Sequence, residues 1–138
     1  MATRLPKDYS PSENEKFMSA RQKEYFRRKL LIWKDGILKE AIGTLESLQT
    51  ESLKEPDIAD RASSETDRSI ELRARDRQRK LVAKIETALG KLENGQYGYC
   101  EVSGEPINLK RLDARPIASM TLEAQEMHEK MEKVHRDD

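Results

Sequence analysis

The segment LKEPDIADRASS, residues 53–64, contains Pro56, the only proline in the central part of the chain. Helical patterns of apolar residues lead into this segment and out of it. A proline ring clashes with the preceding helical turn and has no amide proton to donate, so Pro56 is predicted to end the first helix. The chain then reverses, and residues 54–64 are predicted to form the tip of a helical hairpin. The acids at this tip are Glu55, Asp57 and Asp60.

Apolar residues recur at steps of three and four on both sides of the tip, which is the spacing of one helical face. The row before the tip is Leu30, Trp33, Ile37, Ala41, Leu45 and Leu48, widened by Leu31, Leu38 and Ile42. The row after the tip is Ile70, Ala74, Leu81, Ile85, Ala88 and Leu92, with a polar gap at Arg77 and Gln78. Two such helices joined by a short turn are predicted to pack as an antiparallel coiled coil, residues 12–93.

The ends of the chain flank this coiled coil. Residues 1–11 show no periodicity and are predicted to be a flexible arm. Ser12 and Glu15 match a capping box, which places the start of the first helix at Ser12 and its end near Leu53. The second helix is expected from about Asp57 to Leu92.

Turn-forming glycines follow the second helix and predict a small globular knuckle over residues 94–118. Residues 119–138 are predicted to form a C-terminal helix, capped by Ser119 or Thr121. Its apolar row is Met120, Ala124, Met127, Met131 and Val134. The expected fold class is therefore mainly α: a long antiparallel coiled-coil hairpin, a small knuckle and a C-terminal helix.

Composition narrows the function. Charged residues make up 38% of the 138 residues and aromatic residues 5%, which is typical of long exposed helices. The 26 basic and 26 acidic residues balance, which argues against a general DNA-binding protein. The sequence shows neither a signal peptide nor an apolar run of about 18 residues, so no membrane association is expected. One cysteine excludes an internal disulfide and is consistent with a reducing cytoplasm.

Two charged clusters each allow two interpretations. Asp57 and Asp60 share a helical face, either as a cap and a first-turn acid or as carboxylates that reach a metal or a polar target. Arg73, Arg77, Lys80 and Lys84 are spaced four, three and four residues apart, so they form one basic row. This row is either a solvated face paired with acids of the first helix or a surface for phosphate or an acidic protein.

The residues give little support for a metal site or for catalysis. A structural zinc site needs four Cys or His ligands, but Cys100 is followed three residues later by Ser103. His128 and His135 lie seven residues apart on the C-terminal helix and make a poor site with one thiol. No nucleophile-and-base set and no phosphate-binding glycine loop is visible, so the chain is not expected to be an enzyme.

The segment GQYGYCEVSGEPINLKRLDARP, residues 95–116, resembles the DksA/TraR family of bacterial RNA polymerase regulators. The resemblance extends through residues 72–86 to the tip, where the family carries D-x-x-D-x-A, and covers residues 13–136. The matching knuckle positions are Gly95, Tyr97, Gly98, Cys100, Gly104, Ile107, Arg111, Leu112, Ala114 and Pro116. The chain looks like the long form of the family, which has a complete first helix.

The resemblance implies a monomeric protein that binds in the secondary channel of RNA polymerase without contacting DNA. It implies that the tip residues Asp57, Asp60 and Ala62 act near the active centre, inhibiting ribosomal RNA promoters and activating some amino-acid synthesis promoters. The residues expected to contact the rim of the channel are Arg73, Arg77 and Lys80. The alarmone ppGpp of the stringent response is expected beside Leu81, Lys84 and Arg115.

The chain departs from the family pattern at two places. Ser103, Thr121 and Ala124 replace three of the four zinc ligands, and Cys100 alone remains. The knuckle is therefore expected to fold as a degenerate, metal-free zinc finger. Gln125 stands where the family often has a lysine near ppGpp, which weakens the expected alarmone response.

Three hypotheses follow for function. The first is a polymerase-binding transcription factor without enzymatic activity. The second is a transcript-cleavage factor of the Gre type, which also places acids at the tip of a hairpin and holds Mg²⁺ with them. The third is a coiled-coil adaptor that dimerises through its apolar rows.

Overall fold

The computed structural model describes residues 3–52 and 58–137, and the side chains of these residues except 44, 47–52, 58–64, 136 and 137. It contains the helices α1 (Ala20–Ser52), α2 (Ile58–Asn94), α3 (Leu109–Ala114) and α4 (Leu122–Asp137). The described residues contain no strand, and their one β-bridge joins Tyr99 to Pro106. The mainly α fold predicted from the sequence is confirmed. The turn at Pro56 lies outside the described residues.

The chain divides into two compact units. The hairpin unit is the continuous segment Leu31–Glu86, and the terminal unit combines Met1–Leu30 with Thr87–Asp138. Each unit takes one part of α1 and one part of α2. None of the described helices is long and apolar enough to cross a membrane.

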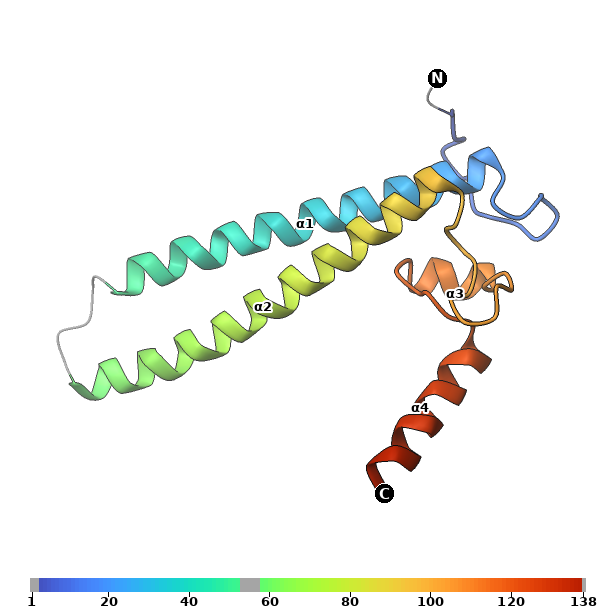
Figure 1. Cartoon of the computed structure of the whole chain (residues 1–138). Coiled ribbons are helices and arrows are strands. Elements are labelled where there is room, and N and C mark those ends of the chain that lie inside the picture. The colour runs from blue at the N-terminus through green and yellow to red at the C-terminus, as the bar shows by residue number, and fades with distance from the viewer. Residues whose placement is uncertain (1–2, 53–57, 138) are drawn as a thin grey trace. The chain divides into compact units, whose positions relative to one another are not determined.

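In the hairpin unit, the α1 and α2 segments run antiparallel and side by side (Figure 1). Ile37 and Ile85 are buried in the seam. Polar contacts also cross it: Lys34 Nζ lies 3.2 Å from Glu86 Oε1, and Gln78 Nε2 donates to Glu40 Oε2 at 3.3 Å. Gln78, in the polar gap of the α2 row, thus contacts the facing helix through Nε2, whereas its Oε1 is buried without a hydrogen-bond partner among the described residues.

The predicted start of the first helix at Ser12 is wrong, because α1 begins at Ala20. Met18 has a left-handed backbone with φ of 53°, which a helix does not continue through. Ser19 is the capping residue, since its Oγ accepts from the Gln22 amide at 3.3 Å and its carbonyl from the Lys23 amide.

The buried side chain of Gln22 holds the segment before α1 in place. Its Oε1 accepts from the Met18 amide at 2.7 Å, and its Nε2 donates to the Ser12 carbonyl at 3.1 Å. Both ends of the side-chain amide are therefore satisfied in a fully buried position. Glu15, expected in a capping box, instead accepts from the Tyr9 hydroxyl.

Aromatic and aliphatic side chains from both ends of the chain form the core of the terminal unit. Phe26 of α1 is fully buried, and its ring lies 5.5 Å from that of Tyr97, centroid to centroid. Ile107 and Leu112 are buried with them. The Tyr97 hydroxyl donates to the Pro116 carbonyl at 2.8 Å, so the one polar atom of this ring is paired.

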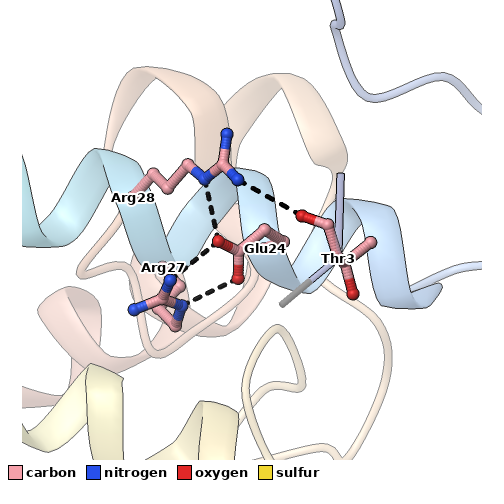
Figure 2. Close-up of polar contacts among 4 residues, drawn as sticks. All are labelled: Thr3, Glu24, Arg27 and Arg28. Atoms are coloured by element: carbon pink, nitrogen blue, oxygen red, sulfur yellow. Dashed lines mark hydrogen bonds and ion pairs between the residues drawn. The ribbon is translucent and has the colours of Figure 1, made fainter. Parts of the chain in front are cut away.

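The buried acid Glu24 on α1 accepts hydrogen bonds from two arginines, and one of these also binds the backbone near the start of the chain. Figure 2 shows Glu24 accepting two hydrogen bonds from Arg27 and one from Arg28, at 2.7–2.8 Å. Arg28 also donates to the Thr3 carbonyl at 3.2 Å. The hydrogen bonds from Arg27 lower the pKa of Glu24 to about 2, and those from Arg28 add to this against the opposing effect of burial.

Replacing Glu24 with Gln should lower the free energy of unfolding at pH 7 by about 1–3 kcal/mol, because three hydrogen bonds lose their charge. The folded pKa lies below the ordinary value of 4.5, so this stabilisation exists above pH 4.5 and disappears as the pH falls towards 2. Urea unfolding at pH 7 and pH 3 measures the difference. The exposed Glu13→Gln is the control, and an equal loss in both variants would contradict the pairing.

Candidate functional site

The basic row of α2 is exposed along its whole length. Lys80 Nζ lies 3.1 Å from Asp76 Oδ2, and Arg79 pairs with the other oxygen of Asp76 at 2.6 Å. Arg73, Arg77 and Lys84 form no ion pair or hydrogen bond with any side chain in the described part of the chain. The row therefore presents three unneutralised cations. Of its two interpretations, the face paired with acids of the first helix is not seen for these three residues in the described part of the chain.

The predicted tip is described only in part. Asp57 lies outside the described residues, whereas Asp60 and Ala62 belong to the first turns of α2. The side chains of these two residues are not described. The role of the tip acids therefore stays a prediction from the sequence.

The knuckle brings together the positions at which the family carries zinc ligands. The Thr121 hydroxyl donates to Cys100 Sγ at 3.9 Å and accepts from the Ala124 amide at 3.2 Å. Thr121 is thus the N-cap of α4, as predicted, and its carbonyl accepts from the Gln125 amide. One hydroxyl therefore joins the buried thiol to the start of the last helix.

Burial raises the pKa of the Cys100 thiol, but hydrogen bonds lower it further, to about 6 from the ordinary value of 9.0. The donors are the Ser103 hydroxyl and the backbone amides of Ser103, Thr121 and Val102. Dipoles aimed at the sulfur favour the charged form, as they do where a thiolate binds metal. Hydroxyl and amide donors therefore surround the Cys100 sulfur.

The residues of this knuckle do not fit a zinc ion. Tetrahedral zinc needs four thiolate, imidazole or carboxylate ligands, whereas the four positions hold one thiol, two hydroxyls and a methyl group. No cluster of three His, Cys, Asp or Glu side chains suited to a metal occurs among the described residues.

Replacing Thr121 with Val should lower the free energy of unfolding by about 1–2 kcal/mol, because α4 loses its cap and Cys100 loses a hydrogen bond. Thr121→Ser retains the hydroxyl and should unfold within about 0.5 kcal/mol of the unchanged protein. Urea unfolding in EDTA measures both without interference from metal. Equal stabilities of the Val and Ser variants would show that the hydroxyl does not hold the knuckle.

A polar triad, not apparent in the sequence, attaches α3 to α1. Asp113 Oδ1 accepts from the Tyr25 hydroxyl at 2.5 Å and from Lys29 Nζ at 2.6 Å, and the Asp113 carbonyl also accepts from Lys29. Burial raises the pKa of Asp113, but the hydrogen bonds from Lys29 and Tyr25 lower it overall. The partners are 84–88 residues apart, so no local pattern could indicate them.

The triad holds α3 against α1, and α3 ends at Arg115, one of the residues expected to lie beside ppGpp. Arg115 is the C-cap of α3, and its amide donates to the Arg111 carbonyl. Arg111 in turn donates through its guanidinium to the Met120 carbonyl and to the side chain of Gln125. Gln125 is therefore engaged by Arg111 and by Glu129. Leu81 and Lys84 lie in the hairpin unit.

Two family models match consecutive parts of the chain. Residues 22–92 match the N-terminal domain of DnaK suppressor protein DksA, and residues 95–130 match the prokaryotic dksA/traR C4-type zinc finger. The chain belongs to the DksA/TraR family. The C4-type zinc-finger model matches although this chain contains only one cysteine.

Individual family members are similar over almost the whole chain. The RNA polymerase-binding transcription factor DksA of Caulobacter vibrioides strain NA1000 is 62% identical over 131 residues, which cover 95% of this chain and 92% of that protein. The protein of the same name from Escherichia coli K12 is 40% identical over 125 residues, 91% and 83% of the two chains.

A solved member of the family shares the fold. The transcription factor DksA2 from Pseudomonas aeruginosa has a TM-score of 0.79 and 38% identity, and the match covers 85% of this chain and 90% of that one. DksA proteins are regulators and not enzymes, so membership favours the first of the three hypotheses over the Gre-type factor and the adaptor.

Proposed function

We propose that this protein binds RNA polymerase in its secondary channel and modulates transcription initiation in the bacterial cytoplasm. The observation that carries the proposal is the 62% identity, over 131 residues, to an RNA polymerase-binding transcription factor. A match that spans 95% of this chain includes the hairpin, the knuckle and the last helix together. Inhibition of ribosomal RNA promoters and activation of amino-acid synthesis promoters are the expected outcomes.

The basic row supplies the contact with the polymerase rim in this proposal. Arg73 and Arg77 are exposed and unneutralised, so they can pair with acids of a partner without first breaking an internal ion pair. Guanidinium groups suit this role, because each can bind a carboxylate with two parallel hydrogen bonds. Lys80 contributes less, since Asp76 already pairs with it.

The tip and the knuckle have separate roles in this proposal. Asp57, Asp60 and Ala62 act near the active centre of the polymerase after binding. The knuckle folds without zinc, which is supported by the donor set around Cys100 and by the hydroxyl that joins it to α4. The protein acts as a monomer and does not contact DNA.

The alarmone ppGpp is proposed to bind beside Leu81, Lys84 and Arg115, with a weaker effect than a lysine at position 125 would give. Gln125 has no charge, and its side chain is already hydrogen bonded to Arg111 and Glu129. A neutral, engaged side chain contributes less to a phosphate site than a free ammonium group.

Replacing Arg77 with Glu should weaken binding to core RNA polymerase at least about tenfold, because an attraction becomes a repulsion at a contact with an acidic rim. Fluorescence anisotropy of the labelled full-length protein measures the affinity, and transcription from a ribosomal RNA promoter, with and without ppGpp, measures the effect. Lys23→Glu makes the same charge change at an exposed position of the terminal unit and should bind normally. Failure of the unchanged protein to bind polymerase would overturn the proposal.

A further inference from the structure

A row of large apolar side chains on α1 lies partly exposed in the hairpin unit. The row consists of Leu31, Leu38, Ile42 and Leu45, whose exposed fractions are 38%, 44%, 59% and 40%. These residues are spaced seven, four and three apart, so they share one face of α1. The sequence suggested that three of them widen the buried seam, but the structure leaves them at the surface. Such a contiguous row is more than the scattered single residues that ordinary surfaces expose.

One residue of this row, Leu38, lines a groove between α1 and α2 with a volume of about 430 Å³. Its floor comes from both helices: Ile37, Leu38 and Ala41 from α1, and Leu72 and Val82 from α2. Leu72 is about half exposed. An apolar floor open to solvent is stabilised when another apolar surface covers it.

The rim of the groove on α2 is cationic. Arg75 and Arg79 line it together with Asp76. Asp76 is already paired with Arg79 and Lys80, so its charge is compensated within α2. Arg75 forms no ion pair or hydrogen bond among the residues that the structure describes. The groove therefore offers an apolar floor with an uncompensated positive charge beside it.

The Arg75 edge of the groove and the basic row lie on different faces of α2. Residues two apart on a helix are separated by about 160° around its axis. Arg75 stands two residues from both Arg73 and Arg77, so the rim of the groove faces away from the basic row. A helical hairpin inserted in a narrow channel contacts the channel walls on both of its faces. The basic row explains the contact on only one face.

We propose that this groove is a second docking surface for RNA polymerase, and that its occupant is an amphipathic helix whose apolar face is bordered by Asp or Glu. The inference rests on the proposed function and adds to it a second surface of the hairpin that contacts the polymerase. An apolar helix face covers the floor and Leu38 at its edge, while its acids pair with Arg75. This arrangement is the usual way in which a groove between two helices takes a third helix.

Affinity measurements on surface variants test the groove. Leu38→Asp and Arg75→Glu should each weaken binding to core RNA polymerase at least about fivefold, the first by removing apolar contact and the second by repelling acids. Arg75→Lys retains the charge and should lose less. Ile32→Asp also places an acid at an exposed apolar residue of α1, but Ile32 does not line the groove, so this control should bind normally. Circular dichroism and thermal unfolding confirm that each variant is folded.

Photocrosslinking gives a second readout in an otherwise unchanged chain. A benzoylphenylalanine at position 38, which lines the groove, should crosslink to a polymerase helix that carries Asp or Glu beside apolar residues. The inference is overturned if the unchanged protein binds and both groove variants bind within twofold of it, or if the crosslink reaches a basic segment or no polymerase segment. Failure of the unchanged protein to bind would overturn the proposed function as well, so the two failures are distinguishable.

Discussion

Replacing Asp60 with Asn should abolish inhibition of a ribosomal RNA promoter and leave the affinity for RNA polymerase within about twofold of that of the unchanged protein. The Asn amide has the shape of the Asp carboxylate but no charge, so the substitution removes only the negative charge of the side chain. Asp60 lies thirteen residues before Arg73 on the same helix, which is about 20 Å. That distance is about twice the screening length at physiological ionic strength, so the charge at the tip contributes little to binding at the basic row.

Transcription in vitro with purified polymerase and anisotropy with the same protein preparation measure the two quantities together. Asp67→Asn is the matched control, because it makes the same substitution at an exposed position two helical turns further along α2. It should inhibit as the unchanged protein does. Full inhibition by Asp60→Asn would show that the tip acid has no part in the mechanism.

Replacing Gly98 with Ala should lower the free energy of unfolding by about 3 kcal/mol, from two sources. Gly98 has a φ of +89°, which an L side chain adopts only at a cost of about 1–3 kcal/mol. An added Cβ would lie 3.0 Å from Met18 Cε and 3.1 Å from Phe17 Cζ, which adds about 1–3 kcal/mol of overpacking. Met18 is buried and has a left-handed backbone of its own, so it has little freedom to yield.

Gly95→Ala separates the two sources. Gly95 has a similar φ of +81°, but nothing lies within 4 Å of its added Cβ. Its variant should therefore lose only the conformational part. Urea unfolding of both variants gives the crowding contribution as the difference between them. If both lose the same free energy, the contact of Gly98 with Phe17 and Met18 does not constrain the fold.

The helices could be predicted because their signals are local. Apolar spacing identifies both long helices, and the predicted ends lie within a few residues of Ser52 and Asn94. The start of α1 could not be predicted, because it depends on the buried side chain of Gln22 and its bond to the Ser12 carbonyl. Ser12 has the sequence of a cap, and only the packing of the terminal unit shows that Ser19 is the cap instead.

The candidate site, too, could be predicted from the sequence only in part. The spacing of Arg73, Arg77 and Lys84 is visible in the sequence. Only the structure shows that Asp76 forms an ion pair with Lys80 and that the other three cations have no such partner in the described part of the chain. The resemblance identified the zinc-ligand positions. It did not show that the Thr121 hydroxyl bonds both Cys100 and the first turn of α4. In the sequence, threonine in place of cysteine indicates only that a zinc ligand is missing.

The division of the chain into units also affects the order in which the protein can fold during synthesis. The hairpin unit is continuous, whereas the terminal unit needs both ends of the chain, so it cannot close until the last third has been made. The bond from Lys29 to Asp113 spans 84 residues, and closing such a loop costs about 4 kcal/mol of chain entropy. A hairpin formed first brings residues 34 and 86 together, which shortens the effective loop to about 30 residues and lowers that cost by about 1 kcal/mol. The nascent hairpin should therefore speed the docking of α3.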